Sequence, residues 1–242
     1  MKILAMDSSA RSASVALWED GRILGECFVN NGLTHSQTLL PMVESLLAHS
    51  RVKIGEIGLF AVSAGPGSFT GIRIGVAAIK GMALAADKPC AGVSTLQAMA
   101  QNLSCVEGVV CASMDARCGQ VYNALFDVSA GRITRLCDDR ALSLEDLGAE
   151  LSALQKNVFF VGDGADLCYN SVKAASKGAS FFALAPEHLR LQNAVGVAQV
   201  GELLYREGLS VPADELRPVY LRLPQAEREL RQRLGTLTKE RK

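Results

Sequence analysis

The sequence predicts an α/β protein of two related lobes, each a mixed sheet that starts with a β-hairpin and is flanked by helices. Three observations support this prediction. Short apolar strands alternate with helix-length segments, a strand–turn–strand pattern opens the chain, and a similar pattern starts again near its middle. We place the first lobe at 1–103, a smaller second lobe at 104–213, and an extended tail with a basic C-terminal helix at 214–242.

The first lobe is expected to follow the order β-β-β-α-β-α-β-α. Strands are predicted at 2–7, 13–18, 22–29, 57–65 and 89–94, and helices at 35–50, 71–87 and 95–103. The turn at 19–21 contains Asp20 and Gly21, which favour a hairpin and therefore an antiparallel pair of strands. Thr34 is the expected N-cap of the first helix, which Pro41 should bend because proline lacks a backbone donor.

The second lobe repeats this plan in part. Strands are predicted at 108–116, 119–128, 132–138 and 157–162, and helices near 143–155, 165–175 and 187–207. From residue 226 the tail has six basic residues against three acidic ones, which fits either contact with RNA phosphates or a solvated terminal helix.

Composition excludes several classes of protein. Of the 242 residues, 49% are hydrophobic and 21% are charged, and the formal net charge is zero, which is typical of an ordinary globular protein without a general affinity for polyanions. The first apolar run is too short for a signal peptide, and no uninterrupted apolar segment is long enough to span a membrane. Seven scattered cysteines without a CxxC pair predict a reducing, cytoplasmic location and neither disulfides nor a zinc site.

The loop "SAGPGSFTGIR" (63–73) is the first candidate site. Its glycines follow an apolar strand and precede a helix, so its amides could hold a phosphate, or the loop could be a purely structural turn. Ile72 follows Gly71 where a Walker A motif needs lysine, and no GxGxxG spacing occurs. Asp7, Asp115 and Asp163 end strands, as magnesium–nucleotide ligands or simple turn formers do. The candidate phosphate or nucleotide residues are Asp7, Ser8, Ser9, Gly65, Gly67, Ser68, Arg73 and Asp115.

Two other kinds of site are disfavoured. "AVSAG" (61–65) is one residue short of a GxSxG elbow, so a Ser63–His188 pair is conceivable, but the segment runs into Pro66 instead of a helix. A two-histidine metal site on the first helix would need a partner for His35 one turn later, where Leu39 stands. We therefore assign neither catalytic residues nor metal ligands.

The helices at 35–50 and 71–87 carry more apolar surface than one core requires. The apolar arc of the first covers about 160°, whereas a helix on a single core needs a stripe of only about 100°. On the second helix, Arg73, Lys80 and Asp87 form one narrow polar strip. Either both helices are sandwiched inside the monomer, or part of this surface meets another subunit. The candidate interface residues are His35, Leu39, Met42, Leu46, Gly71, Gly75, Ala78, Ile79 and Met82.

The motifs "ILAMDSSARSASVAL", "THSQTLLPMVESLL", "SAGPGSFTGIRIGVAAIKGMALA", "GVSTLQAMA", "MDARCGQVY", "VGDGA" and "RPVYLR" resemble, in this order, those of the bacterial TsaB family. The resemblance covers nearly the whole chain. It implies an actin-like fold and a role in tRNA threonylcarbamoyladenosine synthesis beside the catalytic paralogue TsaD and the ATPase TsaE. It also implies homodimers, or heterodimers with the paralogue, formed through first-lobe helices.

The chain departs from its catalytic relatives at two places. The paralogue has an HxxxH metal motif where this chain has His35 and Leu39, and the turn "DSSARS" lacks the glycine that actin-like ATPases place at the nucleotide phosphates. The resemblance therefore implies a non-catalytic subunit that binds and activates the TsaD-type paralogue together with a TsaE-type ATPase. It would hold no cofactor tightly alone, and tRNA would contact it at most indirectly.

Three alternatives stay open at this point. ATP or ADP with Mg²⁺ could occupy a composite site in the assembled complex. The chain could be an actin-like ATP-binding enzyme acting alone through Asp7, Asp115 and the glycine loop. A metallopeptidase is disfavoured, because there is no HExxH motif and no second histidine at helical spacing.

Overall fold

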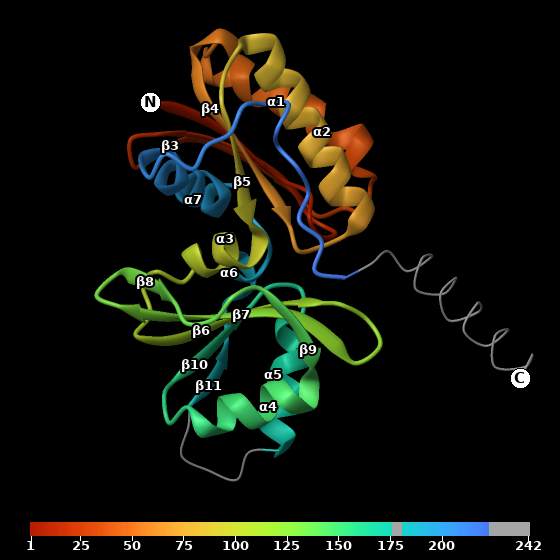
Figure 1. Cartoon of the computed structure of the whole chain (residues 1–242), viewed down its shortest axis with the longest axis vertical. Coiled ribbons are helices and arrows are strands. Elements are labelled where there is room, and N and C mark those ends of the chain that lie inside the picture. The colour runs from red at the N-terminus through yellow and green to blue at the C-terminus, as the bar shows by residue number, and fades with distance from the viewer. Residues whose placement is uncertain (176–180, 223–242) are drawn as a thin grey trace, which may run out of the picture.

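A computed structural model describes residues 1–175 and 181–222 of the chain and shows two mixed sheets, one above the other along the long axis (Figure 1). The prediction of a two-sheet α/β fold is confirmed. The basic helix predicted at the end of the tail lies outside the described residues.

The first sheet has the order β3-β2-β1-β4-β5. Its strands are β1 (Lys2–Asp7), β2 (Ala13–Glu19), β3 (Arg22–Val29), β4 (Ile57–Gly65) and β5 (Cys90–Ser94), with a short 3₁₀ turn, η1 (Ile54–Glu56), before β4. β1 pairs antiparallel with β2 and parallel with β4, so the hairpin edge is antiparallel and the other half is parallel. This arrangement follows from the predicted order of hairpin first and helical crossovers afterwards.

Alternate residues of β1 point to opposite faces of the first sheet, as its pleat requires. Leu4 and Met6 face a core formed with α1 (His35–Ser50) and α2 (Phe69–Ala86). Ile3 and Ala5 face a second core, formed mainly with α7 (Ala194–Arg206). The sheet is therefore covered by helices on both faces, which explains why β1 is almost continuously apolar.

The second sheet has the order β11-β10-β6-β7-β8, and β9 pairs with β7. Its strands are β6 (Gly108–Asp115), β7 (Gln120–Ser129), β8 (Arg132–Arg135), β9 (Arg140–Ser143), β10 (Val158–Val161) and β11 (Phe182–Leu184). α4 (Leu144–Ala153) and α5 (Ala165–Ala175) cover one face, and α3 (Thr95–Gln101) covers the other. α3 lies at the waist of the molecule, between the two sheets (Figure 1).

Two predicted elements differ from the structure, and two strands were not predicted. The strand expected at 132–138 ends at Arg135, and the short strands β9 and β11 are additional. The helix expected at 187–207 is divided into α6 (Glu187–Arg190) and α7, because the Asn193 side chain caps α7 by accepting from Val195 N at 2.6 Å.

The position of α7 bears on the predicted lobes. This helix follows the second sheet in the chain, beyond the boundary placed between residues 103 and 104, yet it packs against β1, β2 and β4 of the first sheet. The chain therefore crosses the waist twice, once near α3 and once between α6 and α7. The boundary itself stays a prediction.

Helix α2 is long and apolar enough to cross a membrane by length and composition alone. In the structure, Ile72, Val76, Ile79 and Ala83 of this helix are in the first core. One helix of this kind is weak evidence for a membrane span, because a core helix passes the same length and composition test.

Glycines let α2 approach the β1–β2 turn closely. A Cβ at Gly71 would lie 2.1 Å from Ser8 O, and one at Gly75 would lie 2.4 Å from Ser8 Oγ. The Ser8 hydroxyl donates to Gly71 O at 2.8 Å, so the contact is both sterically tight and hydrogen-bonded.

We predict that Gly71→Ala lowers the free energy of unfolding by roughly 1–3 kcal/mol, because overpacking forces the helix away from β1. Gly81 of the same helix is the matched control, since a Cβ there meets nothing within 4 Å. Gly81→Ala should raise stability by about 0.5–1 kcal/mol by restricting the unfolded chain. Urea denaturation followed by circular dichroism measures both changes, and equal effects would contradict this account of the contact.

Candidate functional site

A polar cleft of about 560 Å³ lies where the two sheets face each other. The β1–β2 turn, the β4–α2 loop, the end of β6, the β10–α5 turn and the C-terminal segment line it. The lining residues are Ser9, Ala10, Arg11, Pro66, Gly67, Ser68, Phe69, Thr70, Met114, Asp115, Ala116, Arg117, Tyr122, Asp163, Val219, Tyr220, Leu221 and Arg222. Of the predicted phosphate or nucleotide residues, Ser9, Gly67, Ser68 and Asp115 are among them.

Asp7 ends β1 behind this cleft and is buried. Its Oδ1 accepts from Ser9 N at 2.9 Å and from Ser9 Oγ at 2.8 Å, and its Oδ2 accepts from Ser63 Oγ. Burial away from water raises the pKa of the Asp7 carboxyl, and the hydrogen bonds from Ser63 and Ser9 oppose that rise. Ser63 is itself buried and its hydroxyl donates to Asp7, so it is not an accessible nucleophile. This position gives no support to a serine hydrolase.

Residues of the glycine loop (63–73) mainly contact other parts of the chain. Gly65 has φ +134°, and a Cβ there would lie 2.2 Å from Val219 O; a Cβ at Gly67 would lie 2.5 Å from Ser9 O. Ser68 N donates to Ser9 O at 2.7 Å, and Gly71 N donates to Ser68 Oγ at 3.3 Å. These contacts support the structural-turn interpretation, because glycine spacing and two loop amides are already explained without an anion.

A strap, which we define as residues 211–222, covers the edge of the first sheet and reaches the second. It starts at Val211, whose backbone exchanges hydrogen bonds of 2.8 Å with Cys90 of the edge strand β5. Val219 N then donates to Ala64 O at 2.7 Å beside the glycine loop. At its end Arg222 Nη1 donates to Ala116 O at 3.1 Å, after β6. The strap thus connects both sheets across one end of the cleft.

The strap also explains the polar strip of α2. Lys80 Nζ donates to Asp214 O at 3.1 Å and to Leu216 O at 3.2 Å. Arg73 Nε donates to Tyr220 Oη at 2.8 Å. Arg73 and Lys80 of the polar strip therefore bind the strap. In the sequence, the motif "RPVYLR" (217–222) was the signal for this segment.

Asp163 and Asp115 meet in the cleft from two turns of the second lobe. Asp163 Oδ1 accepts from Gln192 Nε2 at 2.6 Å, and Asp115 Oδ1 accepts from Arg117 N at 2.7 Å. Burial among protein atoms raises the pKa of Asp163 to about 6, with smaller contributions from the charges of Asp115 and Asp7. Of the three aspartates named from the sequence, Asp115 and Asp163 thus line the cleft, and Asp7 is buried behind it.

His35 has a structural contact. Its Nε2 donates to Ala10 O at 2.7 Å, which ties the start of α1 to the β1–β2 turn. Leu39, one turn later, is buried in the first core. Within residues 1–175 and 181–222, no three His, Cys, Asp or Glu side chains are grouped so that they could hold a metal ion.

The predicted interface residues need a correction. Leu39, Met42, Leu46, Gly71, Gly75 and Ile79 are buried within the chain, and His35, Ala78 and Met82 are only partly exposed. The buried side chains belong to the core between α1, α2 and the first sheet, because the wide apolar arcs face the sheet and pack between neighbouring elements. Other residues form the outward arc of α2, namely Thr70, Ala77, Gly81, Leu84 and Ala85. On α1, Leu40 is exposed.

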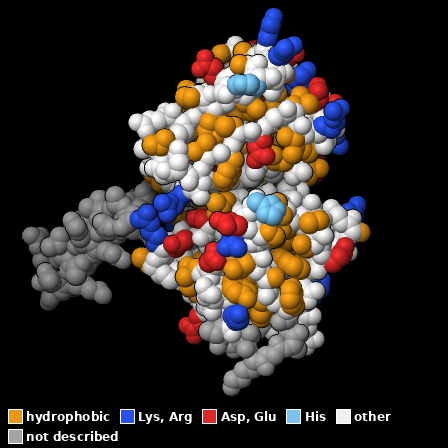
Figure 2. Space-filling model, turned by 180° about the vertical axis from the view of Figure 1, so that it is seen from behind, with side chains coloured by type: hydrophobic (Ala, Val, Ile, Leu, Met, Phe, Trp, Pro, Cys, Tyr) orange, Lys and Arg blue, Asp and Glu red, His pale blue; other side chains and the backbone are white. Residues whose placement is uncertain are grey.

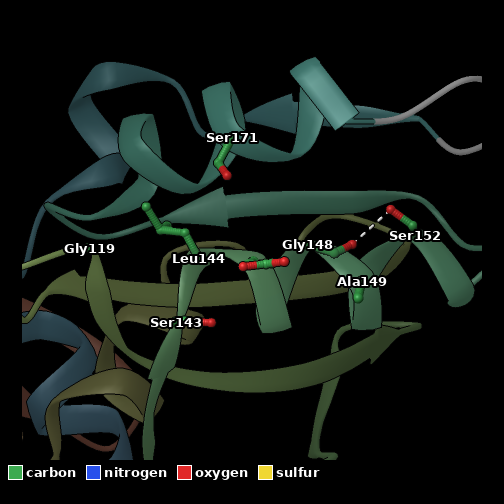
Figure 3. Close-up of a pocket in the computed structure, with 8 residues that line it drawn as sticks. Gly119, Ser143, Leu144, Gly148, Ala149, Ser152 and Ser171 are labelled. Carbon is green, nitrogen blue, oxygen red and sulfur yellow. Dashed lines mark hydrogen bonds between the residues drawn. The ribbon is translucent and has the colours of Figure 1, made fainter.

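A second hollow of about 680 Å³ lies between α4 and α5 (Figure 3). Small side chains line it, including Gly148, Ala149, Ser152 and Ser171, and Ser152 Oγ donates back to Gly148 O at 2.7 Å. None of the residues named from the sequence as candidate phosphate or interface residues lies in it.

With two mixed sheets and a polar cleft between them, the chain has the two-lobed, actin-like fold. The chain is similar to a ROK hexokinase from Thermus thermophilus at a TM-score of 0.50 and 12% identity, over 86% of this chain and 100% of the other, which concerns the fold alone. A closer likeness is to the structure described as YeaZ from Pseudomonas aeruginosa, with a TM-score of 0.77 and 28% identity over 91% of this chain and 99% of that one.

Residues 32–230 match the family described as TsaD: tRNA N6-adenosine threonylcarbamoyltransferase. The chain is 34% identical to the tRNA threonylcarbamoyladenosine biosynthesis protein TsaB of Escherichia coli, over 92% of this chain and 95% of the relative. It is 30% identical to the TsaB of Bacillus subtilis, over 94% and 96% respectively. The chain therefore belongs to this family, as one of its TsaB members.

We predict that replacing Asp163 changes how stability depends on pH. Its pKa is raised to about 6 from 3.8, so the folded state favours the protonated carboxyl, and this contribution to stability is lost as pH rises from about 4 to about 6. Asp163→Asn should therefore gain stability relative to the wild type across this window.

The gain should be on the order of 1 kcal/mol, because one pKa unit corresponds to about 1.4 kcal/mol and this carboxyl also contacts solvent, which screens the effect. Urea denaturation at pH 4, 5, 6 and 7 measures it. Asp138→Asn is the control, because it replaces an exposed carboxylate that lies outside the cleft and forms no ion pair with another described residue. A constant difference between wild type and Asp163→Asn at all four pH values would contradict the pKa shift.

Proposed function

We propose that this chain is a cytoplasmic, non-catalytic subunit in tRNA threonylcarbamoyladenosine biosynthesis. It binds and activates a TsaD-type catalytic paralogue, acting together with a TsaE-type ATPase, and forms a homodimer when alone. The names of the relatives support the biosynthetic role. The seven free cysteines of the described chain support a reducing compartment.

The proposal of a partner rests on the outward arc of α2. Thr70, Ala77, Gly81, Leu84 and Ala85 are exposed along one side of this helix, and all but Thr70 are apolar. Leu84 is 69% exposed, and the small residues beside it leave room for the backbone of another helix to come close. A soluble protein gains from covering such a surface, since burying apolar area is favourable.

The composition of α1 supports the non-catalytic role. Leu39 stands where a paired-histidine motif would place its second ligand, and it is buried in the core, so His35 has no histidine partner one turn later. His35 is in turn engaged by Ala10 O. Catalytic chemistry in the assembly is accordingly assigned to the paralogue.

A second candidate function is an ATP-binding enzyme that acts alone, with ATP or ADP and Mg²⁺ in the cleft. The observation in its favour is that Asp115 and Asp163 line this cleft and the buried Asp7 lies behind it. Calorimetry of the isolated chain with magnesium–ATP distinguishes the two candidates, because stoichiometric binding with turnover would favour the enzyme.

We predict that threonylcarbamoyl transfer to tRNA by the TsaD-type and TsaE-type proteins depends on this chain. Omitting it from a reconstituted reaction should reduce modified adenosine at least about tenfold, a loss equivalent to about 1.4 kcal/mol in the transfer step. Mass spectrometry of digested tRNA gives the yield. Unchanged yield after omission would refute the proposed role.

We predict that Leu84→Asp weakens association with the paralogue at least about tenfold, because a charge would be buried without a partner in the interface. Leu209→Asp is the matched control, since Leu209 is 59% exposed and follows α7 instead of lying on α2. Sedimentation velocity and titration calorimetry measure the association, and circular dichroism checks that both variants fold. Equal affinity of the two variants would exclude the α2 arc as the contact.

A further inference from the structure

Four arginines gather around the rim of the cleft from four separate segments. Arg11 and Arg117 lie in the turns after β1 and β6 and are exposed, and Arg222 ends the strap. Arg73 of α2 stacks on Phe69, one of the lining residues. Basic side chains are visible together at one edge of the waist in Figure 2.

This rim has a local excess of positive charge in a chain with a formal net charge of zero. Only two carboxylates, Asp115 and Asp163, line the cleft beside these arginines. In the described part of the chain, none of the four guanidinium groups forms an ion pair with a carboxylate. Their charge is therefore available to an external anion.

Aromatic rings stand directly beside these charges. Phe69 and Tyr220 have ring centroids 4.9 Å apart at an interplanar angle of 32°, and the Arg73 guanidinium carbon lies 3.8 Å above the Phe69 ring. Tyr220 is 40% exposed, so one side of this stack is open. Aromatic and guanidinium planes bind unstacked nucleobases, and neighbouring arginines bind the phosphates between them.

The placement of the groups favours a polyanion over a free nucleotide. The loop amides of Ser68 and Gly71 are already paired, and Val219 lies against Gly65, so these groups of the loop are not free to hold a terminal phosphate. The guanidinium groups are instead spread along the rim over both lobes. Separate charges of this kind suit successive phosphates of a nucleic-acid strand.

We propose that this rim, defined by Arg11, Phe69, Arg73, Arg117, Tyr220 and Arg222, binds the sugar–phosphate backbone and one unstacked base of single-stranded RNA. The inference rests on the proposed function, which supplies an RNA substrate to the assembly. It goes further by giving this subunit a direct contact with that RNA. Because α2 carries both Arg73 and the outward apolar arc, the RNA would lie next to the partner contact.

The test uses the complete assembly of this chain with the TsaD-type and TsaE-type proteins. The probe is a fluorescein-labelled RNA stem-loop with adenosines in its single-stranded loop, and anisotropy gives Kd over a series of KCl concentrations. The double variant Arg11→Ala/Arg117→Ala should weaken binding about tenfold and reduce the slope of log K against log salt by about 0.7 per lost phosphate contact. Tyr220→Ala should weaken binding without changing that slope.

Arg22→Ala/Arg132→Ala is the matched control, because both arginines are exposed and lie outside the cleft, on β3 and β8. It should leave Kd and the salt slope unchanged. Size-exclusion chromatography first establishes that all variants enter the assembly. If the wild-type chain itself does not assemble, the proposed function fails, and this inference fails with it.

If the variants assemble and transfer threonylcarbamoyl groups, but RNA affinity and salt slope equal those of the wild type, only the RNA inference is overturned. It is also overturned if poly-glutamate of equal charge competes as well as unlabelled RNA does, since the rim would then bind anions without regard to bases. If Arg11→Ala/Arg117→Ala abolishes magnesium–ATP binding by the isolated chain but leaves RNA affinity unchanged, the rim binds a nucleotide and the RNA inference is overturned.

Discussion

The rest of the structure depends on the close approach of α2 to the β1–β2 turn. At Gly71 and Gly75 the helix contacts Ser8 so closely that no side chain would fit, and the Ser8 hydroxyl is bonded to the helix backbone. This contact sets the direction in which α2 leaves the glycine loop. It therefore decides which side of the helix faces the sheet, which side meets the strap, and which side is left for solvent.

The same contact shapes the cleft. With α2 held against β1, Asp7 is buried behind the loop, and Phe69 and Arg73 stand at the rim instead of in the core. The strap then uses the remaining polar groups of α2, because Lys80 bonds its carbonyls and Arg73 bonds Tyr220. One helix consequently serves three purposes, as a core element, as a support for the strap, and as the proposed surface for a partner.

Much of the fold could be predicted, because its elements are strongly periodic and its turns are marked by Asp, Gly and Ser. The position of Asp115 and Asp163 in the cleft could also be predicted, since Asp115 ends β6 and Asp163 follows β10, which lies beside β6 in the second sheet. The interface residues were less predictable. Helical periodicity identifies the excess of apolar surface on α1 and α2, but it does not tell whether Leu46 or Leu84 faces outward, which the neighbouring sheet decides.

By itself, the sequence determined the fold class, the order of the first-lobe elements, the family, and the absence of a histidine one turn after His35, where Leu39 stands. These properties are local, because strand and helix periods, turn residues and motif spacing are set by near neighbours in the chain. Only the tertiary structure decided that α7 covers the first sheet, that the strap closes one end of the cleft, and that Arg11, Arg117 and Arg222 line this cleft with Arg73 stacked on Phe69 beside them. Such contacts join residues more than a hundred positions apart, and their formation depends on packing that no local pattern encodes.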